Sequence, residues 1–348
     1  MVKGKTRRTR VKRVIIKNKT SKTRIKEKKT KSKRLVLTPK AITEKLKRDI
    51  LSVKIQGAEN IALESVKTLK EVIKHSREKT INGLMMEVLN FFNEVSGVRP
   101  TEPCLHNSFN FIKQKMLTTA DQEDPAEFVS NILNYCDEVL SHFERSKQVI
   151  NNLVFRKIPN GSIVFTHCHS STVVDALIYS FKKGKDFVVY NTETRPLFQG
   201  RITASELSHA GIRVYHFVDS AARIALKKAD IMLIGADVIT SEGKIINKVG
   251  SELFAETAHN FDVPVYSCTD SWKFDVNSIF AFDVEIEKRF EKEVWPEKPK
   301  GVIINNYAFE KVNQENITGV ISELGIFRPT VFIEEFKHNY PFLLKKID

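Results

Sequence analysis

Short apolar runs alternate with helical patterns after Ile158, and this alternation limits the possible folds more than any other feature. The runs cover residues 162–166, 186–190, 211–215, 231–234 and 263–266. Helical patterns lie between them at residues 173–181, 203–210, 221–227 and 251–259. Buried strands that alternate with helices predict a parallel sheet covered by helices on both faces. The sequence therefore predicts an α/β protein with a Rossmann-like layer.

The rest of the body is expected to be mainly helical. Residues 40–155 carry apolar residues at three- and four-residue spacing, and a long stripe begins after Asp124-Pro125 and continues to Leu153. We expect an N-terminal helical domain over 40–155 that ends in a long linking helix, followed by the Rossmann-like domain over 156–348. Within the latter we also expect a strand at 302–304 and a helix near 317–324.

The positive charge of the chain is concentrated at its start. Residues 1–34 contain seventeen Lys or Arg and one acid, for a charge of +16, whereas the rest of the chain carries −2. A segment this basic cannot bury enough apolar surface to fold alone, so residues 1–39 are predicted to be a disordered tail. The tail either keeps the protein in solution or contacts RNA nonspecifically through its phosphates.

Composition also bears on compartment and cofactor. The four cysteines show no CxxC spacing, which favours a reducing compartment, and no apolar run approaches the length of a membrane span. We therefore expect a cytoplasmic protein that contacts no membrane. The GxGxxG fingerprint is absent, so no dinucleotide is expected, and we predict no other cofactor.

Reactive and polar residues gather where the predicted strands end. In an open parallel sheet, ligands bind beyond the carboxyl ends of the strands. Four such ends carry residues 166–172 (Thr-His-Cys-His-Ser-Ser-Thr), 191–196 (Asn-Thr-Glu-Thr-Arg-Pro), 219–220 (Asp-Ser) and 235–237 (Gly-Ala-Asp). This edge of the sheet is the predicted ligand site.

Cys168 and Asp237 each allow two interpretations. Cys168 precedes a predicted helix start, whose N–H groups favour anions and would lower the pKa of a thiol; the alternative is a small buried hydrophobic residue. Asp237 is either a general acid or base or a cap. His167 and His169 flank the cysteine, but strand neighbours point to opposite faces, so we predict packing roles and no metal.

Several of these residues, taken in order, resemble one family. The matching segments are Gln56-Gly57-Ala58, Arg99-Pro100-Thr101, residues 166–171, residues 192–196 with Gln199-Gly200, Gly235-Ala236-Asp237 and Asn247-Lys248-Val249-Gly250. The chain resembles, from about residue 40 to its end, the superfamily that joins the α, β and δ subunits of translation initiation factor 2B to two sugar-phosphate isomerases. Within it, the sequence is most similar to the archaeal ribose-1,5-bisphosphate isomerases.

The resemblance implies specific roles for residues of this chain. Cys168 and Asp237 would carry the acid–base work of an aldose–ketose isomerase on a phosphorylated sugar. The implied substrate contacts are Gln56, Gly57, Ala58, Glu59, Arg99, Ser170, Ser171, Thr172, Asn247, Lys248 and Lys273. The resemblance also implies activation by AMP and assembly into a homodimer or homohexamer.

One departure from the family pattern keeps a second function open. The isomerases typically carry Arg-Gly-Ala-Gly where this chain has Gln56-Gly57-Ala58-Glu59, and a lost arginine costs about 1.5–3 kcal/mol of phosphate binding. The alternatives are an enzyme that converts ribose 1,5-bisphosphate to ribulose 1,5-bisphosphate and a regulatory subunit that binds a sugar phosphate or nucleotide and contacts initiation factor 2. A methylthioribose 1-phosphate isomerase is a third.

Overall fold

The computed structural model describes residues 38–119, 124–280, 284 and 286–344. The basic tail and its predicted disorder and RNA contact lie outside these residues. Among the helices described, none has the length together with the hydropathy that a passage through a lipid bilayer requires.

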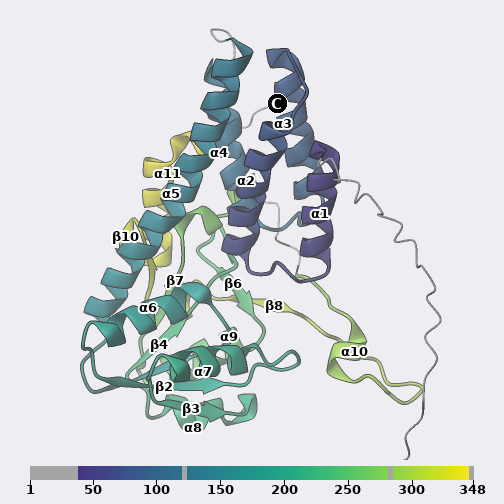
Figure 1. Ribbon diagram of the computed structural model, residues 1–348. Coiled ribbons are helices and arrows are strands. Elements are labelled where there is room, and N and C mark those ends of the chain that lie inside the picture. Colours follow the sequence, from purple (N-terminus) through teal and green to yellow (C-terminus); the bar gives the residue numbers. More distant parts are fainter. Residues whose placement is uncertain (1–37, 120–123, 281–283, 285, 345–348) are drawn as a thin grey trace, which may run out of the picture. The chain divides into compact units, whose positions relative to one another are not determined.

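Five helices come first in the described chain (Figure 1). Thr38 caps the first, accepting a hydrogen bond from the Ala41 N–H at 3.2 Å, and Asp124 caps the fifth through the N–H groups of Ala126 and Glu127. Pro follows the cap directly in both, where its missing N–H costs nothing. The helices are α1 (Pro39–Leu51), α2 (Ala58–Lys74), α3 (Ile81–Ser96), α4 (Pro103–Thr119) and α5 (Pro125–Lys157).

A seven-stranded sheet follows, in the order β10-β9-β7-β4-β1-β2-β3. All of its strands are parallel except β10, which pairs antiparallel with β9. The chain adds strands outward from β1 to one side and then returns to build the other side from β4, as in doubly wound folds. The strands are β1 (Ser162–Thr166), β2 (Phe187–Thr192), β3 (Val214–Phe217), β4 (Ile231–Ile234), β7 (Val265–Cys268), β9 (Gly319–Ser322) and β10 (Gly325–Phe327).

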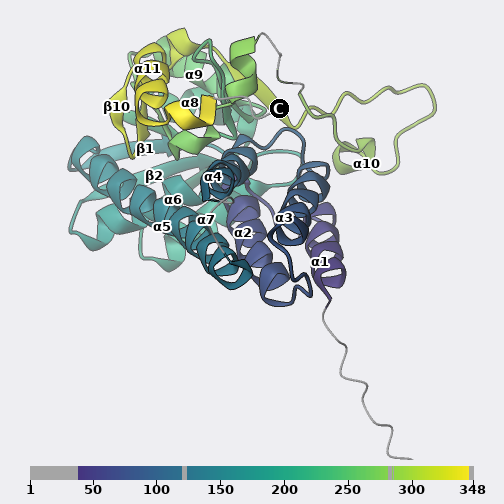
Figure 2. The same ribbon diagram turned by 90° about the horizontal axis from the view of Figure 1, so that it is seen from above.

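Helices cover the sheet, and a small second sheet lies beside it. Helices α6 (Ser171–Lys182) and α7 (Gln199–His209) pack against each other, as do α8 (Ala222–Leu226) and α9 (Ser251–His259). The carboxyl half of α5 packs along α6, and its amino half packs on α2 and α4 (Figure 2). The second sheet has the order β5-β6-β8 and consists of β5 (Val238–Ile239), β6 (Ile245–Lys248) and β8 (Phe309–Val312).

The predicted α/β class and the parallel sheet with helical cover are confirmed, but two local predictions are wrong. Residues 317–324 contain β9, not a helix, because Gly319–Ser322 is fully buried and pairs with β7. A buried run this short cannot be assigned to helix or strand by periodicity alone. The expected strand at 302–304 is irregular, and Ile303 is 82% exposed, so the segment buries no side-chain face against a sheet.

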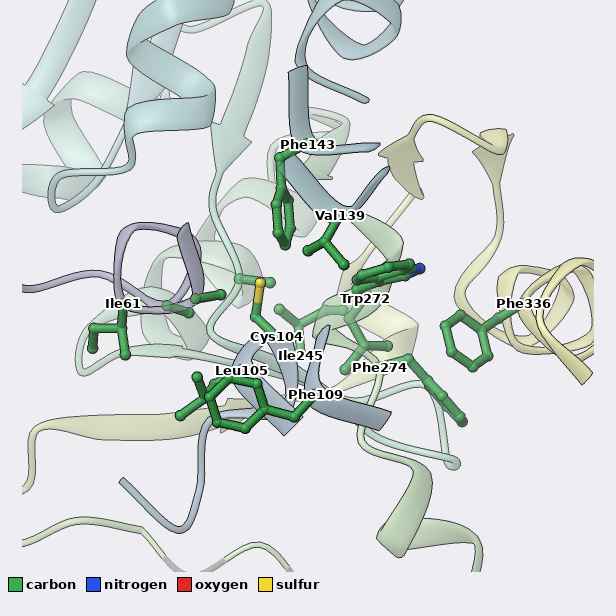
Figure 3. Packing of buried hydrophobic residues seen from close by; sticks show 14 of the residues in the cluster. Ile61, Cys104, Leu105, Phe109, Val139, Phe143, Ile245, Trp272, Phe274 and Phe336 are labelled. Carbon is green, nitrogen blue, oxygen red and sulfur yellow. The ribbon is translucent and has the colours of Figure 1, made fainter. Parts of the chain in front are cut away.

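One hydrophobic core joins the helices to the sheet. It includes residues from α2, α4 and α5 together with Trp272, Phe274 and the sheet strands. Figure 3 shows Trp272 among Val139 and Phe143 of α5, with Phe336 of α11 (Pro329–Asn339) nearby. Because both predicted domains supply this core, their division at residue 155 stays a prediction.

Candidate functional site

The candidate site lies at the point where the strand order reverses. β1 and β4 are neighbours, with Thr166 opposite Leu233, so the two strands end almost level. Cys168 follows β1 and Asp237 follows β4. Gly235 allows these two strand ends to approach, because a Cβ there would lie 2.7 Å from Ser170 Oγ. The topology therefore brings together the two residues that the sequence singled out.

The backbone of Cys168 is held in an unusual conformation. Its φ is 66°, in the left-handed region that a non-glycine residue rarely adopts. The Cys168 N–H donates to Thr194 Oγ1 at 3.0 Å, and the Cys168 carbonyl accepts from Thr203 Oγ1 at 2.8 Å. The loop after β2 and helix α7 therefore fix the backbone of a residue that follows β1. Strained residues of this kind cluster at functional sites.

The thiol of Cys168 is protonated in this environment. Burial raises its pKa to about 11, and the Asp237 charge acts in the same direction, while Lys248 and a hydrogen bond from the His169 N–H oppose both. The predicted lowering by the start of α6 is wrong, because the residue is only 9% exposed and the cost of desolvating a thiolate outweighs the attraction of nearby N–H groups. Cys168 is therefore buried, as the second interpretation expects, and it also lies at the strand end beside Asp237, as the first interpretation requires.

Asp237 has a raised pKa as well. Burial is the main cause, with a smaller contribution from Glu287, and the cations Lys273, Lys248 and Arg99 oppose it in that order. Its N–H donates to the Ile246 carbonyl at 2.9 Å, which fixes the backbone against β6. A carboxyl group that is buried but also interacts with three cationic charges can hold a proton and also release it.

Two lysines approach Asp237 from different elements. Lys273 belongs to the short turn η2 (Ser271–Lys273), is 6% exposed, and donates through Nζ to the Ala236 carbonyl at 2.7 Å. Lys248 ends β6 and lies over the Phe309 ring, 4.9 Å from its centroid. Both predicted cations therefore reach the site, and neither is the solvated lysine that a lone residue would suggest.

Arg99 reaches the site in the company of acids that the sequence did not reveal. Its guanidinium donates to Glu102 Oε1 at 2.7 and 3.1 Å and lies 3.8 Å from Glu287 Oε2. Glu102 is 7% exposed, and burial raises its pKa despite Arg99. Glu102 follows Arg99 by only three residues, so that contact had a signal, but Glu287 is distant in sequence and had none.

The predicted segment 56–59 forms the start of α2. Gly57 is the residue before the helix and has φ 87°, a conformation that suits glycine. Gln56 is exposed, Ala58 is buried, and Glu59 has a pKa raised by burial and lowered in part by Lys273. Glu59 thus belongs to the same electrostatic cluster as Lys273.

The remaining predicted contacts lie at the start of α6 and on β6. Ser170 caps α6, accepting from the Val173 N–H at 3.4 Å, and Ser171 is exposed. Thr172 Oγ1 is buried and has no hydrogen-bond partner among the described residues. Asn247 is buried on β6 and donates to Ser251 Oγ at 3.0 Å, so its role in the free protein is to hold the start of α9.

His167 has a structural role. One ring nitrogen lies 2.6 Å from Thr192 Oγ1 and the other lies 3.0 Å from the Val249 carbonyl, which requires Nε2 to donate. Burial lowers its pKa to about 4, so the ring is neutral. His169 Nδ1 lies 3.1 Å from Thr203 Oγ1. His167 joins the ends of β1 and β2 to the loop before α9, as the packing interpretation expects.

The sequence predicts Asp219 at this edge of the sheet but indicates no specific role for it. Its carboxylate accepts from the N–H groups of Thr194 at 2.8 Å and Arg195 at 2.7 Å. Thr194 in turn accepts the Cys168 N–H, so Asp219 supports the loop that fixes the thiol. Its position directly after β3, at the same sheet edge, was the available signal.

Comparison with known proteins places these features in a family. The Initiation factor 2 subunit family matches residues 54–329. The chain belongs to this family. The ribose 1,5-bisphosphate isomerase of Pyrococcus furiosus is 32% identical over 87% of this chain and 94% of that protein. The protein of the same name from Methanocaldococcus jannaschii is 32% identical over 83% of this chain and 91% of its own length.

A solved structure of the family has the same fold. The translation initiation factor eIF-2B from Pyrococcus horikoshii OT3 superposes with a TM-score of 0.70, at 25% identity, over 85% of this chain and 98% of that one. The resemblance proposed from the ordered motifs is therefore confirmed. Members with different names share the fold, so the function has to be argued from the site.

Proposed function

We propose that this chain is an aldose–ketose isomerase that converts ribose 1,5-bisphosphate to ribulose 1,5-bisphosphate. The observation that carries the proposal is the position of Cys168 and Asp237 at adjacent strand ends, where the charges of three cations act on the Asp237 carboxyl group. The named activities of the two archaeal relatives support the same reaction class. No cofactor enters the proposal, because the reaction only redistributes protons within the sugar.

The chemistry needs one proton acceptor and one donor. Asp237, protonated, gives its proton to the ring oxygen as the bond from that oxygen to C1 breaks. Cys168, ionised, takes the proton from C2 to form an enol phosphate and then returns a proton to C1. Asp237 recovers its proton from the C2 hydroxyl as the ketone forms. The sum is an isomerisation with no net proton change.

The raised pKa of Cys168 sets a cost for this assignment. At neutral pH, forming a thiolate whose pKa is about 11 costs roughly 5 kcal/mol, since each pKa unit corresponds to about 1.36 kcal/mol. The cost is smaller if the proton leaves while Asp237 stays neutral, because the Asp237 charge is one of the causes of the raised value. The reactive form of the pair therefore carries one proton, on the carboxyl group.

Phosphate binding is assigned to the cations and helix starts around the pair. Lys273, Lys248 and Arg99 all act on the Asp237 carboxyl group, α6 begins directly after the end of β1, and Glu59 in the first turn of α2 interacts with the charge of Lys273. Free N–H groups at a helix start favour phosphate. Two phosphates on one substrate match two groups of donors, which favours a bisphosphate over a monophosphate.

The acids of the site favour the alternative, a regulatory subunit. Glu102 and Glu287 occupy the guanidinium of Arg99, and Glu59 lies near Lys273. A phosphate that approaches either cation must displace or tolerate a carboxylate. A protein that only senses a sugar phosphate or nucleotide, and contacts initiation factor 2, needs the pocket but not the turnover.

A direct assay separates the two functions. Purified protein is incubated with ribose 1,5-bisphosphate, with and without AMP, and the ketose bisphosphate is measured. We expect product from the unchanged chain and a loss of at least about 100-fold in kcat for Cys168→Ser, in line with losses for acid–base groups. Cys136→Ser is the control, since Cys136 is also a buried cysteine but lies in the core on α5.

The outcome that contradicts the enzyme is equally concrete. Binding of the bisphosphate in calorimetry, without ketose product at any pH, refutes the isomerase and supports the sensor. Retention of initiation factor 2 on the immobilised chain, abolished by the sugar phosphate, would then identify its partner.

A further inference from the structure

The turn η2 has two sides, and only one of them belongs to the site described above. Lys273 projects toward the Ala236 carbonyl and Asp237. Trp272, its neighbour in the turn, packs on the opposite side among His142 and Phe143 of α5 and Tyr340. Contacts that hold Trp272 and the backbone of the turn therefore also restrain the position of Lys273.

Two acids hold the backbone of the turn. Glu323, directly after β9, accepts from the Ser271 N–H at 3.0 Å, and Asp270 accepts from the Trp272 N–H at 2.8 Å. Asn107 of α4 holds the carbonyl groups of Trp272 and Phe274 at 2.7 and 2.9 Å. Together these contacts restrain the turn that carries Lys273 and the residue that follows it.

His142 supplies the positive charge that these acids require. Its Nε2 lies 3.1 Å from one oxygen of Asp270 and 3.3 Å from the other. Its ring stacks on Trp272, with centroids 4.0 Å apart and planes at 14°. Asp270 is 2% exposed, so a charged carboxylate there without a partner would be costly. The histidine is thus placed both to neutralise Asp270 and to brace Trp272.

The same three side chains have the composition of a metal site, but their hydrogen bonds favour a proton. One ligand-type atom from each of His142, Asp270 and Glu323 lies within 4.8 Å of the others. However, the two oxygens of Glu323 already accept from the Ser271 N–H and from three hydroxyl groups, those of Ser146, Ser271 and Tyr340. A metal would have to displace these donors.

We propose that His142, Asp270 and Glu323 are positioning residues, whose protonated network fixes the turn Ser271–Lys273 and so holds the Lys273 ammonium beside Asp237. The catalytic consequence rests on the proposed function, since it assumes that Lys273 binds substrate phosphate. The claim that the network fixes the turn does not depend on the proposed function. The network acts on the site without touching the substrate.

The network is expected to depend on pH through His142. Burial lowers the pKa of His142, but the charge and hydrogen bond of Asp270, together with the Glu323 charge, raise it by more, while Arg145 on the same helix opposes them. The net pKa lies above the ordinary 6.5. The stabilisation is therefore complete below pH 6.5 and is lost as the pH rises through the folded-state value.

A cavity gives the network access to water. It has a volume of about 500 Å³ and is lined by His142, Glu323, Tyr340 and Trp272, with Glu138 and Arg145 among the other residues. Protons can therefore exchange with the imidazole without unfolding of the core. This is the geometry that a titrating group needs and that a fully enclosed ion pair lacks.

Hydrogen exchange of the turn tests the structural claim without any enzyme assay. In His142→Gln, a neutral N–H donor replaces the charged one, and we expect the amides of Ser271 and Trp272 to exchange about tenfold faster, as for loss of one charged hydrogen bond. His338→Gln, at an exposed histidine on α11, is the control and should leave them unchanged. Unchanged exchange in His142→Gln overturns the proposal.

A second measurement leaves the network intact and so does not depend on whether the variant folds. Trp295→Phe leaves Trp272 as the only tryptophan, and a protonated imidazole stacked on an indole quenches its fluorescence. We expect the emission of Trp272 to rise with pH, with a midpoint above 6.5. A midpoint at or below 6.5 overturns the proposal. The proposal is also overturned if the metal-loaded protein binds zinc or manganese stoichiometrically and His142→Gln abolishes that metal binding.

Kinetics then connect the network to the site. For the isomerase, we expect His142→Gln to raise KM for the bisphosphate about tenfold while kcat changes less than about threefold, because a loosened cation weakens binding more than chemistry. If exchange and fluorescence respond as expected but no turnover exists, the proposed function fails and the network stands. If turnover exists and neither probe responds, only the network fails.

Discussion

Replacing Gly235 with alanine would test whether the contact between the two strand ends sets the geometry of the site. An added Cβ would lie 2.7 Å from Ser170 Oγ and 2.8 Å from Ser170 Cβ, whereas ordinary contacts begin at 3.4 Å. One of the two segments must therefore move by about 0.6–0.7 Å to restore normal contact distances. Ser170 is two residues from Cys168 and Gly235 is two residues from Asp237, so the movement reaches both reactive groups.

The magnitude follows from the size of this shift. Overpacking of a close-packed site costs about 1–3 kcal/mol of the free energy of unfolding. A misplacement approaching 1 Å can reduce turnover by about 100-fold, so a shift of roughly half that size is expected to reduce kcat by about tenfold. Gly235 has no left-handed backbone conformation, so steric overlap is the whole of the expected effect.

A double-mutant cycle with Ser170→Gly isolates the contact. Glycine removes both clashing atoms and, as a helix cap, costs only a few tenths of a kcal/mol relative to serine. Urea unfolding of the single and double variants should therefore show a coupling of about 1–3 kcal/mol. Gly83→Ala is the control, because it lies in the first turn of α3, at the opposite end of that helix from Arg99, and an added Cβ there would meet mainly the flexible Glu78 side chain. Additive effects of Gly235→Ala and Ser170→Gly would refute the reasoning.

Three further predictions concern charge. The pH profile of kcat/KM should be bell-shaped, because the Cys168–Asp237 pair is active with one proton bound. Its acid limb should lie above the ordinary Asp pKa of 3.8, and its alkaline limb should lie near pH 11. A profile that rises without limit would contradict the assignment. Glu287→Gln removes a charge that raises the pKa of Asp237, so the acid limb should move to lower pH, and an unchanged limb would exclude the contact. KM should fall a few-fold, because only Glu102 would still compete with a phosphate for Arg99. Lys273→Met should move the acid limb to higher pH, because the Lys273 charge lowers the pKa of Asp237, and it should raise KM at least about tenfold. Lys298→Met, at a lysine paired with Glu291, is the control. A shift of the limb to lower pH would contradict the role of Lys273.

Much of the fold could be predicted because buried parallel strands appear in the sequence as short continuous apolar runs. The runs 162–166 and 231–234 and the helix 251–259 coincide with β1, β4 and α9. The small antiparallel sheet was missed, since β5 is only two residues long and β6 lies close behind it. A strand of two residues is too short for a periodicity to be measured.

Part of the site could also be predicted from the sequence, and part could not. Cys168 and Asp237 were found because topology alone carries the ends of neighbouring strands to one edge. The direction of the Cys168 pKa was wrong, since it depends on how deeply the thiol is buried, which local sequence does not specify. Glu287 and the second side of η2 depend on contacts between segments more than 100 residues apart, such as His142 with Asp270.

The long helix α5 has a consequence for how a ligand enters. Its 33 residues extend over about 50 Å and pack on α2 and α4 at one end and on α6 and β9 at the other. An uninterrupted helix cannot bend as a hinge, so the first turn of α2 and the strand ends keep a fixed separation. Entry and release must then be timed by shorter segments, such as the one that brings Glu287 to Arg99 and the Val294 carbonyl to Arg195.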